Sequence, residues 1–262
     1  MKPGKQTLFI TGTGTGVGKT VLTALLAEFL RRRGVRVAAL KPICSGGRND
    51  ALALQRALGG TLPLEEINPW HFRAPVAPLL AARRERKKVG LAAVLRHVRM
   101  VRKGFDVTLV EGAGGLLSPL GEGFDSRDLI CALNATPIIV APNKLGVVNH
   151  LLLTLEALPL RLRGRAKIVL MSPREPDSAT ATNAGLLKEL APRDVFTMPW
   201  LDKHSPFATA GRILAALVSV PIRKKTIKHR ELLLPVVWQT GKLTTVNQLG
   251  LRGVPVSHVA PK

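Results

Sequence analysis

A glycine-rich run near the amino terminus has the composition of a phosphate-binding loop. It occupies residues 12–18, follows a short β-branched and apolar stretch at residues 7–11, and leads into Lys19 and Thr20. Glycines let successive backbone N–H groups converge on phosphate oxygens, and the amino end of a following helix adds partial positive charge. In that arrangement Lys19 reaches the outer phosphates and Thr20 can ligate Mg²⁺. Thr13 replaces the first glycine of the strict consensus, but the strand and helix context is right.

Two carboxylates are candidates to complete the coordination of a nucleotide-bound magnesium ion, a task usually performed by a carboxylate at the end of a neighbouring strand. Glu111 follows the apolar stretch at residues 107–110 and precedes the small residues 112–115, which would let phosphates approach. The alternative for Glu111 is a surface carboxylate at a strand end. Asp50 opens an apolar helical pattern, so a helix N-cap is the simpler interpretation of Asp50 taken alone.

Lys41 ends a second strand-like stretch at residues 35–40. A lysine at the carboxyl end of a parallel strand faces the crevice in which ligands bind in such folds, whereas a solvated lysine could stand anywhere. On position alone, both interpretations of Lys41 stay open. The neighbouring Cys44 is expected to pack and not to act as a nucleophile, because no histidine is suggested nearby.

These residues must be positioned by strands that alternate with helices. The expected strands are residues 7–11, 35–40, 107–110, 137–141 and 167–171, and the helical patterns are residues 19–33, 91–103, 125–133 and a leucine-rich stretch that ends near residue 158. This alternation predicts right-handed crossovers and a mostly parallel central sheet covered on both faces. We therefore expect a three-layer, Rossmann-like α/β fold of the P-loop type. The Pro- and Arg-rich segment 61–86 has little periodicity and is predicted to be a surface excursion.

The composition is that of a globular protein. The chain has 262 residues, of which 46% are hydrophobic, enough for one large domain with a core. That domain is expected at residues 1–221. Residues 222–262 lose the pattern and are predicted to be a basic, peripheral or partly disordered extension. The apolar stretches and the first 20 residues predict neither a membrane crossing nor a secretion signal, so we expect a cytoplasmic protein.

The charge is strongly basic, with 39 Lys and Arg against 17 Asp and Glu and a formal net charge of +22. The basic residues are spread along the chain and not confined to one arm, which is typical of solvated surface. Nonspecific attraction to nucleic acid is expected as a physical property and not as the purpose of the protein. The two cysteines and six histidines are scattered, which excludes a disulfide framework and favours no metal site made from them.

Several motifs occur together and in order, and in combination the chain resembles the dethiobiotin synthetase family over about residues 5 to 215. They are Gly12-Thr13-Gly14-Thr15-Gly16-Val17-Gly18-Lys19-Thr20, Lys41-Pro42 with Ser45-Gly46, Asn49-Asp50-Ala51-Leu52, Glu111-Gly112-Ala113-Gly114-Gly115, Lys144-Leu145-Gly146 with Asn149-His150, and Pro199-Trp200-Leu201. The resemblance implies an ATP- and Mg²⁺-dependent cyclo-ligase that converts 7,8-diaminononanoate and CO2 to the ureido ring of dethiobiotin, usually as a homodimer.

The resemblance also implies roles for individual residues. Lys41 would stabilise a substrate carbamate, and Lys19 the transferred phosphoryl group. Thr15 would take part in catalysis, and Thr15 and Ser45 would hold polar groups of the substrate. Residues 146–149 would donate N–H groups to the substrate carboxylate near a dimer interface, with Gly146 and Asn149 as contacts. The metal would be held by Thr20, Asp50 and Glu111. The nucleotide would be bound by Gly16, Val17, Gly18, Lys19, Thr20, Val21, Asp50, Glu111, Gly112, Ala113, Gly114, Pro199, Trp200 and Leu201.

Two other functions are compatible with a phosphate-binding loop. A cobyrinate amide synthetase also activates an oxygen nucleophile with ATP, but no glutaminase-like second domain fits in the remaining residues. A partitioning-type ATPase that binds DNA nonspecifically would suit the basic charge. Such switches carry a lysine early in the loop, where this chain has Thr13 and Gly14. ATP turnover stimulated by DNA would favour the partitioning ATPase over the ligase.

Overall fold

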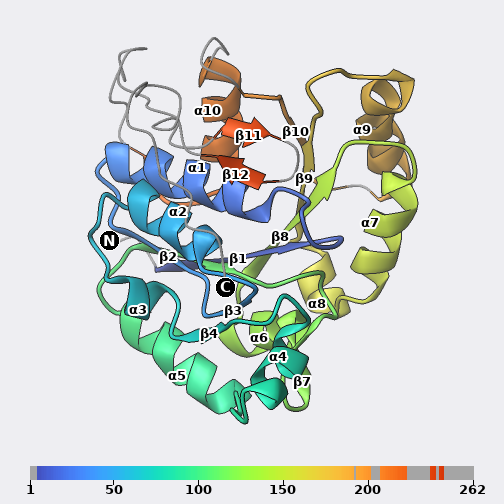
Figure 1. Ribbon diagram of the computed structural model, residues 1–262. Helices are drawn as coiled ribbons and strands as arrows, with labels where there is room; N and C mark the ends of the chain where they lie inside the picture. Colours follow the sequence, from blue (N-terminus) through green and yellow to red (C-terminus); the bar gives the residue numbers. More distant parts are fainter. Residues whose placement is uncertain (1–4, 192, 202–206, 223–236, 240–241, 245–262) are drawn as a thin grey trace, which may run out of the picture.

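A six-stranded parallel sheet forms the centre of the computed structural model, which describes residues 5–191, 193–201, 207–222, 237–239 and 242–244 (Figure 1). The order of its strands is β10-β9-β8-β1-β5-β2, and every neighbouring pair is parallel. The strands are β1 (Gln6–Gly12), β2 (Val37–Leu40), β5 (Val107–Glu111), β8 (Thr136–Pro142), β9 (Lys167–Met171) and β10 (Val195–Met198). The five expected strands are confirmed, and β10 is a sixth that the sequence pattern did not predict.

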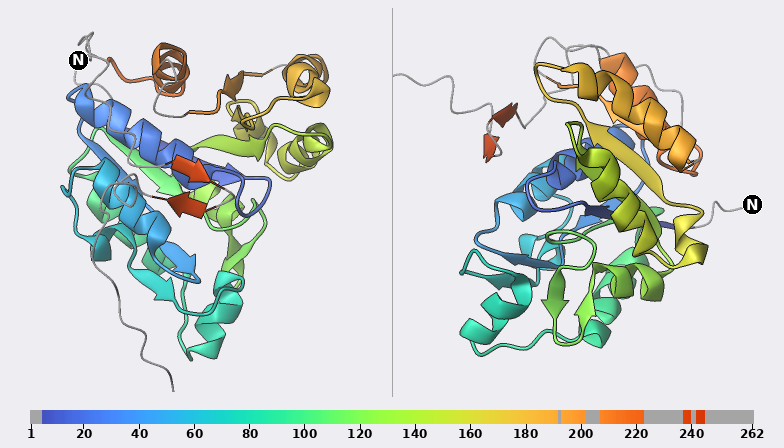
Figure 2. Two further views of the ribbon diagram at one scale, coloured as in Figure 1. Left: turned by 45° about the horizontal axis from the view of Figure 1, so that its top comes forward. Right: turned by 90° about the vertical axis from the view of Figure 1, so that its right-hand side faces the viewer.

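Helices cover both faces of this sheet, which confirms the three-layer α/β fold. Figure 1 shows α1 and α10 on one side of the sheet and α5 and α6 on the other, and Figure 2 gives two further views of these layers. The helices are α1 (Lys19–Arg32), α2 (Asn49–Ala57), α3 (Leu64–Ile67), α4 (Pro78–Arg84), α5 (Leu91–Arg102), α6 (Ser126–Leu133), α7 (Val147–Glu156), α8 (Leu160–Arg163), α9 (Ser178–Leu190) and α10 (Phe207–Ala216). Within the described ranges, no helix combines the length and the apolar character needed to span a membrane.

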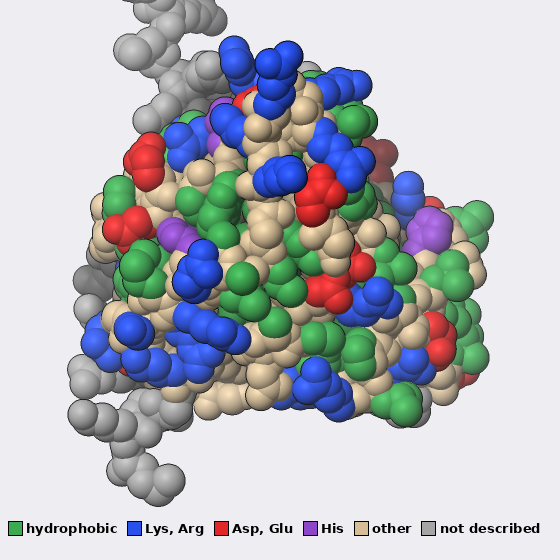
Figure 3. Space-filling view, turned by 90° about the horizontal axis from the view of Figure 1, so that it is seen from below, with side chains coloured by type: hydrophobic (Ala, Val, Ile, Leu, Met, Phe, Trp, Pro, Cys, Tyr) green, Lys and Arg blue, Asp and Glu red, His purple; other side chains and the backbone are tan. Residues whose placement is uncertain are grey.

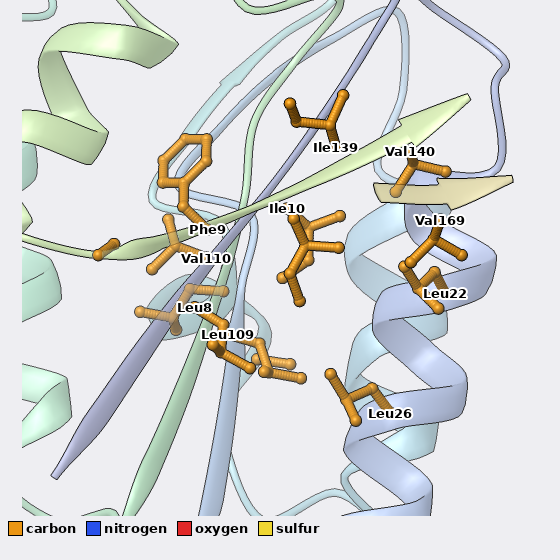
Figure 4. Packing of buried hydrophobic residues seen from close by; sticks show 14 of the residues in the cluster. Leu8, Phe9, Ile10, Leu22, Leu26, Leu109, Val110, Ile139, Val140 and Val169 are labelled. Atoms are coloured by element: carbon orange, nitrogen blue, oxygen red, sulfur yellow. The ribbon is translucent and has the colours of Figure 1, made fainter. Parts of the chain in front are cut away.

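The core lies between the sheet and these helices. Leu8, Phe9 and Ile10 of the central strand β1 are fully buried. Figure 4 shows side chains of β1, β5, β8 and β9 gathered beside Leu22 and Leu26 of α1. A strand buried on both faces has a near-continuous apolar sequence, which is why β1 has no polar and apolar alternation. The core therefore fixes the end of β1, from which the glycine-rich loop departs.

The segment 61–86 is not a mere surface excursion. It contains α3, α4 and the strand β4 (Trp70–Phe72), which pairs in parallel with β3 (Ile43–Ser45). Ile67 and Phe72 are fully buried in it. The prediction was wrong because short elements of three to seven residues leave too little periodicity to detect.

The remaining strands are short. β6 (Pro119–Gly121) and β7 (Phe124–Asp125) form an antiparallel pair. β11 (Val237–Gln239) and β12 (Lys242–Thr244) form another, and most of the extension predicted at residues 222–262 lies outside the described residues. On the face shown in Figure 3, Lys and Arg side chains form separate groups with hydrophobic side chains between them, as expected for charge spread along the chain.

Candidate active site

The loop after β1 has a backbone that requires glycine. Gly16 and Gly18 adopt φ values of 74° and 98°, in the left-handed region that other residues rarely occupy. A Cβ on Gly12 would lie 2.7 Å from Val17 Cγ2 and 2.9 Å from the Val140 carbonyl oxygen. Gly18 is the N-cap of α1 and provides no side-chain cap, so N–H groups at the start of α1 are available to an anion. The predicted phosphate loop therefore has the geometry that its sequence indicates.

Lys19 is folded back over this loop. Its Nζ donates a hydrogen bond of 2.6 Å to the carbonyl oxygen of Gly14. Burial, and next the positive charge of Lys41, lower the pKa of Lys19 to about 8, although the Glu111 and Asp50 carboxylates act in the opposite direction. Phosphate oxygens would replace the Gly14 carbonyl with charged partners, so the site favours an anion at this position.

Lys41 is buried beside the loop and bound to two carboxylates. Its Nζ lies 2.6 Å from Glu111 Oε1 and 2.7 Å from Asp50 Oδ2, and Thr20 Oγ1 donates to the same Glu111 oxygen at 2.7 Å. Burial lowers the pKa of Lys41, but the charges of Glu111 and Asp50 outweigh it and raise that pKa above its ordinary value. Burial raises the pKa of Asp50, and the Lys41 charge overcomes this effect and holds it low. The side chains therefore form one connected, charged cluster of Lys41, Asp50, Glu111 and Thr20.

This cluster decides between the interpretations that the sequence left open. Lys41 and Glu111 have only 4% and 1% of their surface exposed, so neither is a solvated surface residue. The N-cap interpretation of Asp50 is wrong, because α2 begins at Asn49 after Arg48 and the Asp50 carboxylate binds Lys41 instead. A tertiary ion pair has overridden the local preference for capping.

The oxygen atoms of this cluster suit a magnesium ion. Glu111 Oε2 is buried and has no hydrogen-bond partner in the described part of the chain, and the Asp50 carboxylate and Thr20 hydroxyl lie beside the same lysine and glutamate. Mg²⁺ prefers oxygen ligands and is usually held by one or two carboxylates together with substrate phosphates. Among the described residues, no group of three or more His, Cys, Asp or Glu could hold a metal alone. The residues present therefore fit an ion that arrives with phosphate ligands.

The small residues after β5 pack against the phosphate loop. A Cβ on Gly112 would lie 2.8 Å from Ser126 Oγ, and one on Gly115 would lie 3.5 Å from the Gly12 carbonyl oxygen. Gly114 has φ 70°, and a Cβ there would lie 3.8 Å from Thr15 Oγ1. This close approach brings Gly114 beside the exposed Thr15, as expected for loops that share one ligand, whereas Gly112 packs against Ser126 of α6.

The other predicted site residues stand outside the charged cluster. Ser45 is on β3, and its hydroxyl donates to the Val76 carbonyl oxygen at 2.6 Å. Gly146 is the left-handed N-cap of α7, and Asn149 is exposed in the first turn of that helix. Residues 199–201 follow β10 and are half-buried, and Val21 is half-buried in α1. Gly146 follows the carboxyl end of β8, and residues 199–201 follow the carboxyl end of β10. Both therefore lie at the same carboxyl edge of the parallel sheet as the phosphate loop.

Sequence reasoning missed a residue that holds Lys41 in place. Asn68 is buried, and its Nδ2 donates to the Lys41 carbonyl oxygen at 2.7 Å, while its Oδ1 accepts hydrogen bonds from Cys44 and Arg48. The backbone N–H of Lys41 donates to Ile67. No sequence signal indicated this role, because Asn68 lies in the segment that showed no periodicity.

The comparisons with known proteins agree with this geometry. A family model described as an AAA domain matches residues 6–210. An ATP-dependent dethiobiotin synthetase of Anaeromyxobacter dehalogenans is 40% identical over 218 residues, which are 80% of this chain and 98% of the relative. Another, from Rhodococcus erythropolis, is 42% identical over 181 residues, 66% of this chain and 79% of the relative. The chain belongs to the dethiobiotin synthetase family.

Membership of the dethiobiotin synthetase family confirms the predicted activity class, an ATP-dependent cyclo-ligase of biotin biosynthesis, and the partitioning-type ATPase is not favoured. A solved structure, the MinC:MinD cell division protein complex of Aquifex aeolicus, has a TM-score of 0.49 and 17% identity, and the match covers 84% of this chain and 98% of that one. That likeness is too weak to bear on the function of the chain.

Proposed function

We propose that the charged cluster and the phosphate loop close the ureido ring of dethiobiotin from 7,8-diaminononanoate, CO2 and ATP. The observation that carries this proposal is the position of Lys41, an ammonium held between Asp50 and Glu111 beside the phosphate-binding Lys19. A ligase that phosphorylates a carboxylated amine needs a cation there to bind the second anion, and Lys41 comes from the end of β2 and not from the phosphate loop.

The chemistry divides into three steps. One substrate amine attacks CO2 and loses a proton, which gives a carbamate. A carbamate oxygen then attacks the γ-phosphorus of ATP and releases ADP, which leaves a carbamic-phosphoric anhydride. The second amine attacks the anhydride carbonyl, phosphate leaves, and the ring closes. Each step brings bound groups together or neutralises developing charge, and catalysis of this kind depends on positioning and electrostatics.

Lys41 and Lys19 supply the positive charge in this scheme. An ammonium has three N–H donors, so Lys41 can bind a carbamate oxygen while it still contacts Asp50 and Glu111. Lys19 would exchange the Gly14 carbonyl for oxygens of the transferred phosphoryl group. Thr15 is exposed on the phosphate loop next to Gly114, where its hydroxyl can contact substrate polar groups.

Thr20, Asp50 and Glu111 would hold the magnesium ion that accompanies ATP. When bound, this ion neutralises negative charge on the phosphates. The support is the oxygen donor set and the unpartnered Glu111 Oε2. Gly112, Ala113 and Gly114 follow Glu111 directly, so their backbone would lie beside the phosphates that accompany this ion.

The amino end of α7 is proposed to bind the substrate carboxylate. Gly146 gives α7 no side-chain cap, so N–H groups there are available to an anion, and Asn149 is exposed in the same turn. Leu145 and Leu153 are largely exposed beside it, which supports a homodimer that covers this helix. Use of ATP supports a cytoplasmic location. Residues 199–201 would contact the nucleoside.

The test is product formation by the purified full-length protein. With 7,8-diaminononanoate, labelled bicarbonate, ATP and Mg²⁺, we expect labelled dethiobiotin and one ADP per ring, measured by mass spectrometry and nucleotide chromatography. ADP release without incorporation of label, or turnover stimulated by DNA and indifferent to the diamine, would contradict the proposal.

A further inference from the structure

A buried network of polar side chains connects the loop after β8 to helix α9. The Nδ2 of Asn183 donates to Asn143 Oδ1 at 2.9 Å and to the Lys144 carbonyl oxygen at 3.2 Å. Asn143 Nδ2 donates to the Thr180 carbonyl oxygen at 3.0 Å, and the Thr180 hydroxyl contacts both the Asn143 carbonyl oxygen and the capping residue Asp177. Asn143, Thr180 and Asn183 are all buried.

The network reaches the turn that starts α7. The carbonyl oxygen of Lys144 accepts the Asn183 amide and also the backbone N–H of Val147, the first residue of α7. Gly146, between them, has φ 86°. The backbone N–H of Asn143 donates to the Met171 carbonyl oxygen at the end of β9. The turn is therefore fixed on both sides, by the sheet and by α9.

Packing alone would not require these polar groups. Buried amides are costly to desolvate and are tolerated only when their hydrogen bonds are made. A fully bonded network rigidifies its surroundings and specifies one arrangement, whereas apolar side chains can slide against one another. The buried amides of Asn143 and Asn183 therefore indicate a role beyond packing, because these two residues hold the turn that orients the uncapped amino end of α7.

We propose that Asn183, acting through Asn143 and the Lys144 carbonyl, is a positioning residue that aims the amino end of α7 at the substrate carboxylate. This inference rests on the proposed function of that helix end. Asn183 touches no substrate in this scheme. Its loss would loosen the turn at Gly146 without altering the phosphate loop, so it should affect the diamine and not ATP.

The experiment compares Asn183→Leu with wild type in the full-length protein. Leu has a similar volume but donates no hydrogen bond. We expect the KM for the diamine to rise at least tenfold while the KM for ATP stays within twofold, because small displacements of a binding group are costly. Amide hydrogen exchange of residues 144–150 should become faster.

Thr182→Val is the matched control. Thr182 is exposed on the same helix, and among the described residues its hydroxyl bonds only to the Ser178 and Ala179 carbonyl oxygens within α9. We expect both KM values and the exchange of residues 144–150 to stay at the wild-type level. Asn183→Gln, which keeps both N–H donors, should recover part of the diamine affinity.

The double variant Asn143→Leu with Asn183→Leu keeps the inference testable if the single variant does not fold, because replacing both partners avoids an unpaired buried amide. It should show the same selective rise in the diamine KM. A folded Asn183→Leu or double variant with a diamine KM within twofold of wild type, or with equal losses for diamine and ATP, would overturn the inference. A wild-type protein that forms no dethiobiotin would instead refute the proposed function.

Discussion

Replacing Lys41 by Met tests the charge balance of the site. Met keeps the apolar stem of the side chain and removes the ammonium. The lost Nζ lies 2.6 Å from Glu111 Oε1 and 2.7 Å from Asp50 Oδ2, so the variant leaves two carboxylates facing each other in a largely buried site. We expect the variant to lose dethiobiotin formation and stability together, while it still binds ATP through the phosphate loop.

The size of the stability loss follows from the geometry. At about 5 Å and an effective dielectric constant of about 20, two unit charges repel each other by about 3 kcal/mol. Removing one partner of a buried ion pair costs about 3 to 5 kcal/mol. The Asp50 side chain is 39% exposed, so solvent screens part of this cost. We expect the free energy of unfolding to fall by about 2 to 3 kcal/mol at pH 7.

The loss should depend on pH in a defined direction. In the wild type, Lys41 depresses the pKa of Asp50 in the folded protein. This depression stabilises the fold above the unfolded-state pKa of about 3.9, and the stabilisation is lost as the pH falls through the folded-state pKa of Asp50. Without Lys41 this contribution is absent. The difference in unfolding free energy between the two proteins should therefore be largest near neutral pH and narrow below about pH 4.

Urea unfolding at several pH values and product analysis by mass spectrometry measure these effects. Lys188→Met, which removes an exposed lysine of α9, is the matched control and should change neither quantity. A Lys41→Met protein with wild-type stability at pH 7 and full dethiobiotin formation would refute the reasoning.

Three further perturbations test other parts of the site. ATP binding near pH 8 should take up about half a proton per site, because Lys19, with a pKa of about 8, is half protonated until phosphates raise that pKa. Calorimetric heats should then vary with the ionisation enthalpy of the buffer, and heats independent of the buffer would contradict this. Gly18→Ala should weaken ATP binding at least tenfold, since Gly18 has φ 98° and the new Cβ would lie 3.0 Å from Met171 Cγ. The control Gly60→Ala changes a glycine at φ 75° that faces open space. This control should lower the free energy of unfolding by about 1 to 2 kcal/mol and leave ATP affinity unchanged. Any association with duplex DNA should weaken steeply with salt in anisotropy titrations and be unaffected by ATP and diamine. Salt-independent binding would contradict a nonspecific electrostatic attraction.

The fold and the phosphate loop could be predicted because their signals are local. The apolar run of β1, the glycines that follow and the helical face beginning at Lys19 all lie within about 25 consecutive residues. Glu111 was identifiable because it ends the buried apolar strand β5. The carboxyl ends of parallel strands meet at one edge, so local patterns were enough to bring these residues together.

The rest depended on contacts between residues distant in sequence. Asp50 looks like a helix cap until Lys41 is seen beside its carboxylate. Asn68 supports Lys41 from a segment without periodicity, and Asn143 meets Asn183 across 40 residues. A polar side chain with a distant buried partner has no sequence pattern that distinguishes it from a solvated one.

In the proposed function, one crevice holds the terminal phosphate of ATP and the carbamate of the diamine within reacting distance. Crystals of the protein with 7,8-diaminononanoate, bicarbonate, Mg²⁺ and a nonhydrolysable ATP analogue test it most directly. We expect a carbamate oxygen within about 3.5 Å of the γ-phosphorus and hydrogen-bonded to Lys41 Nζ. Electron density for the diamine in a separate place, away from Lys41 and the triphosphate, would contradict it.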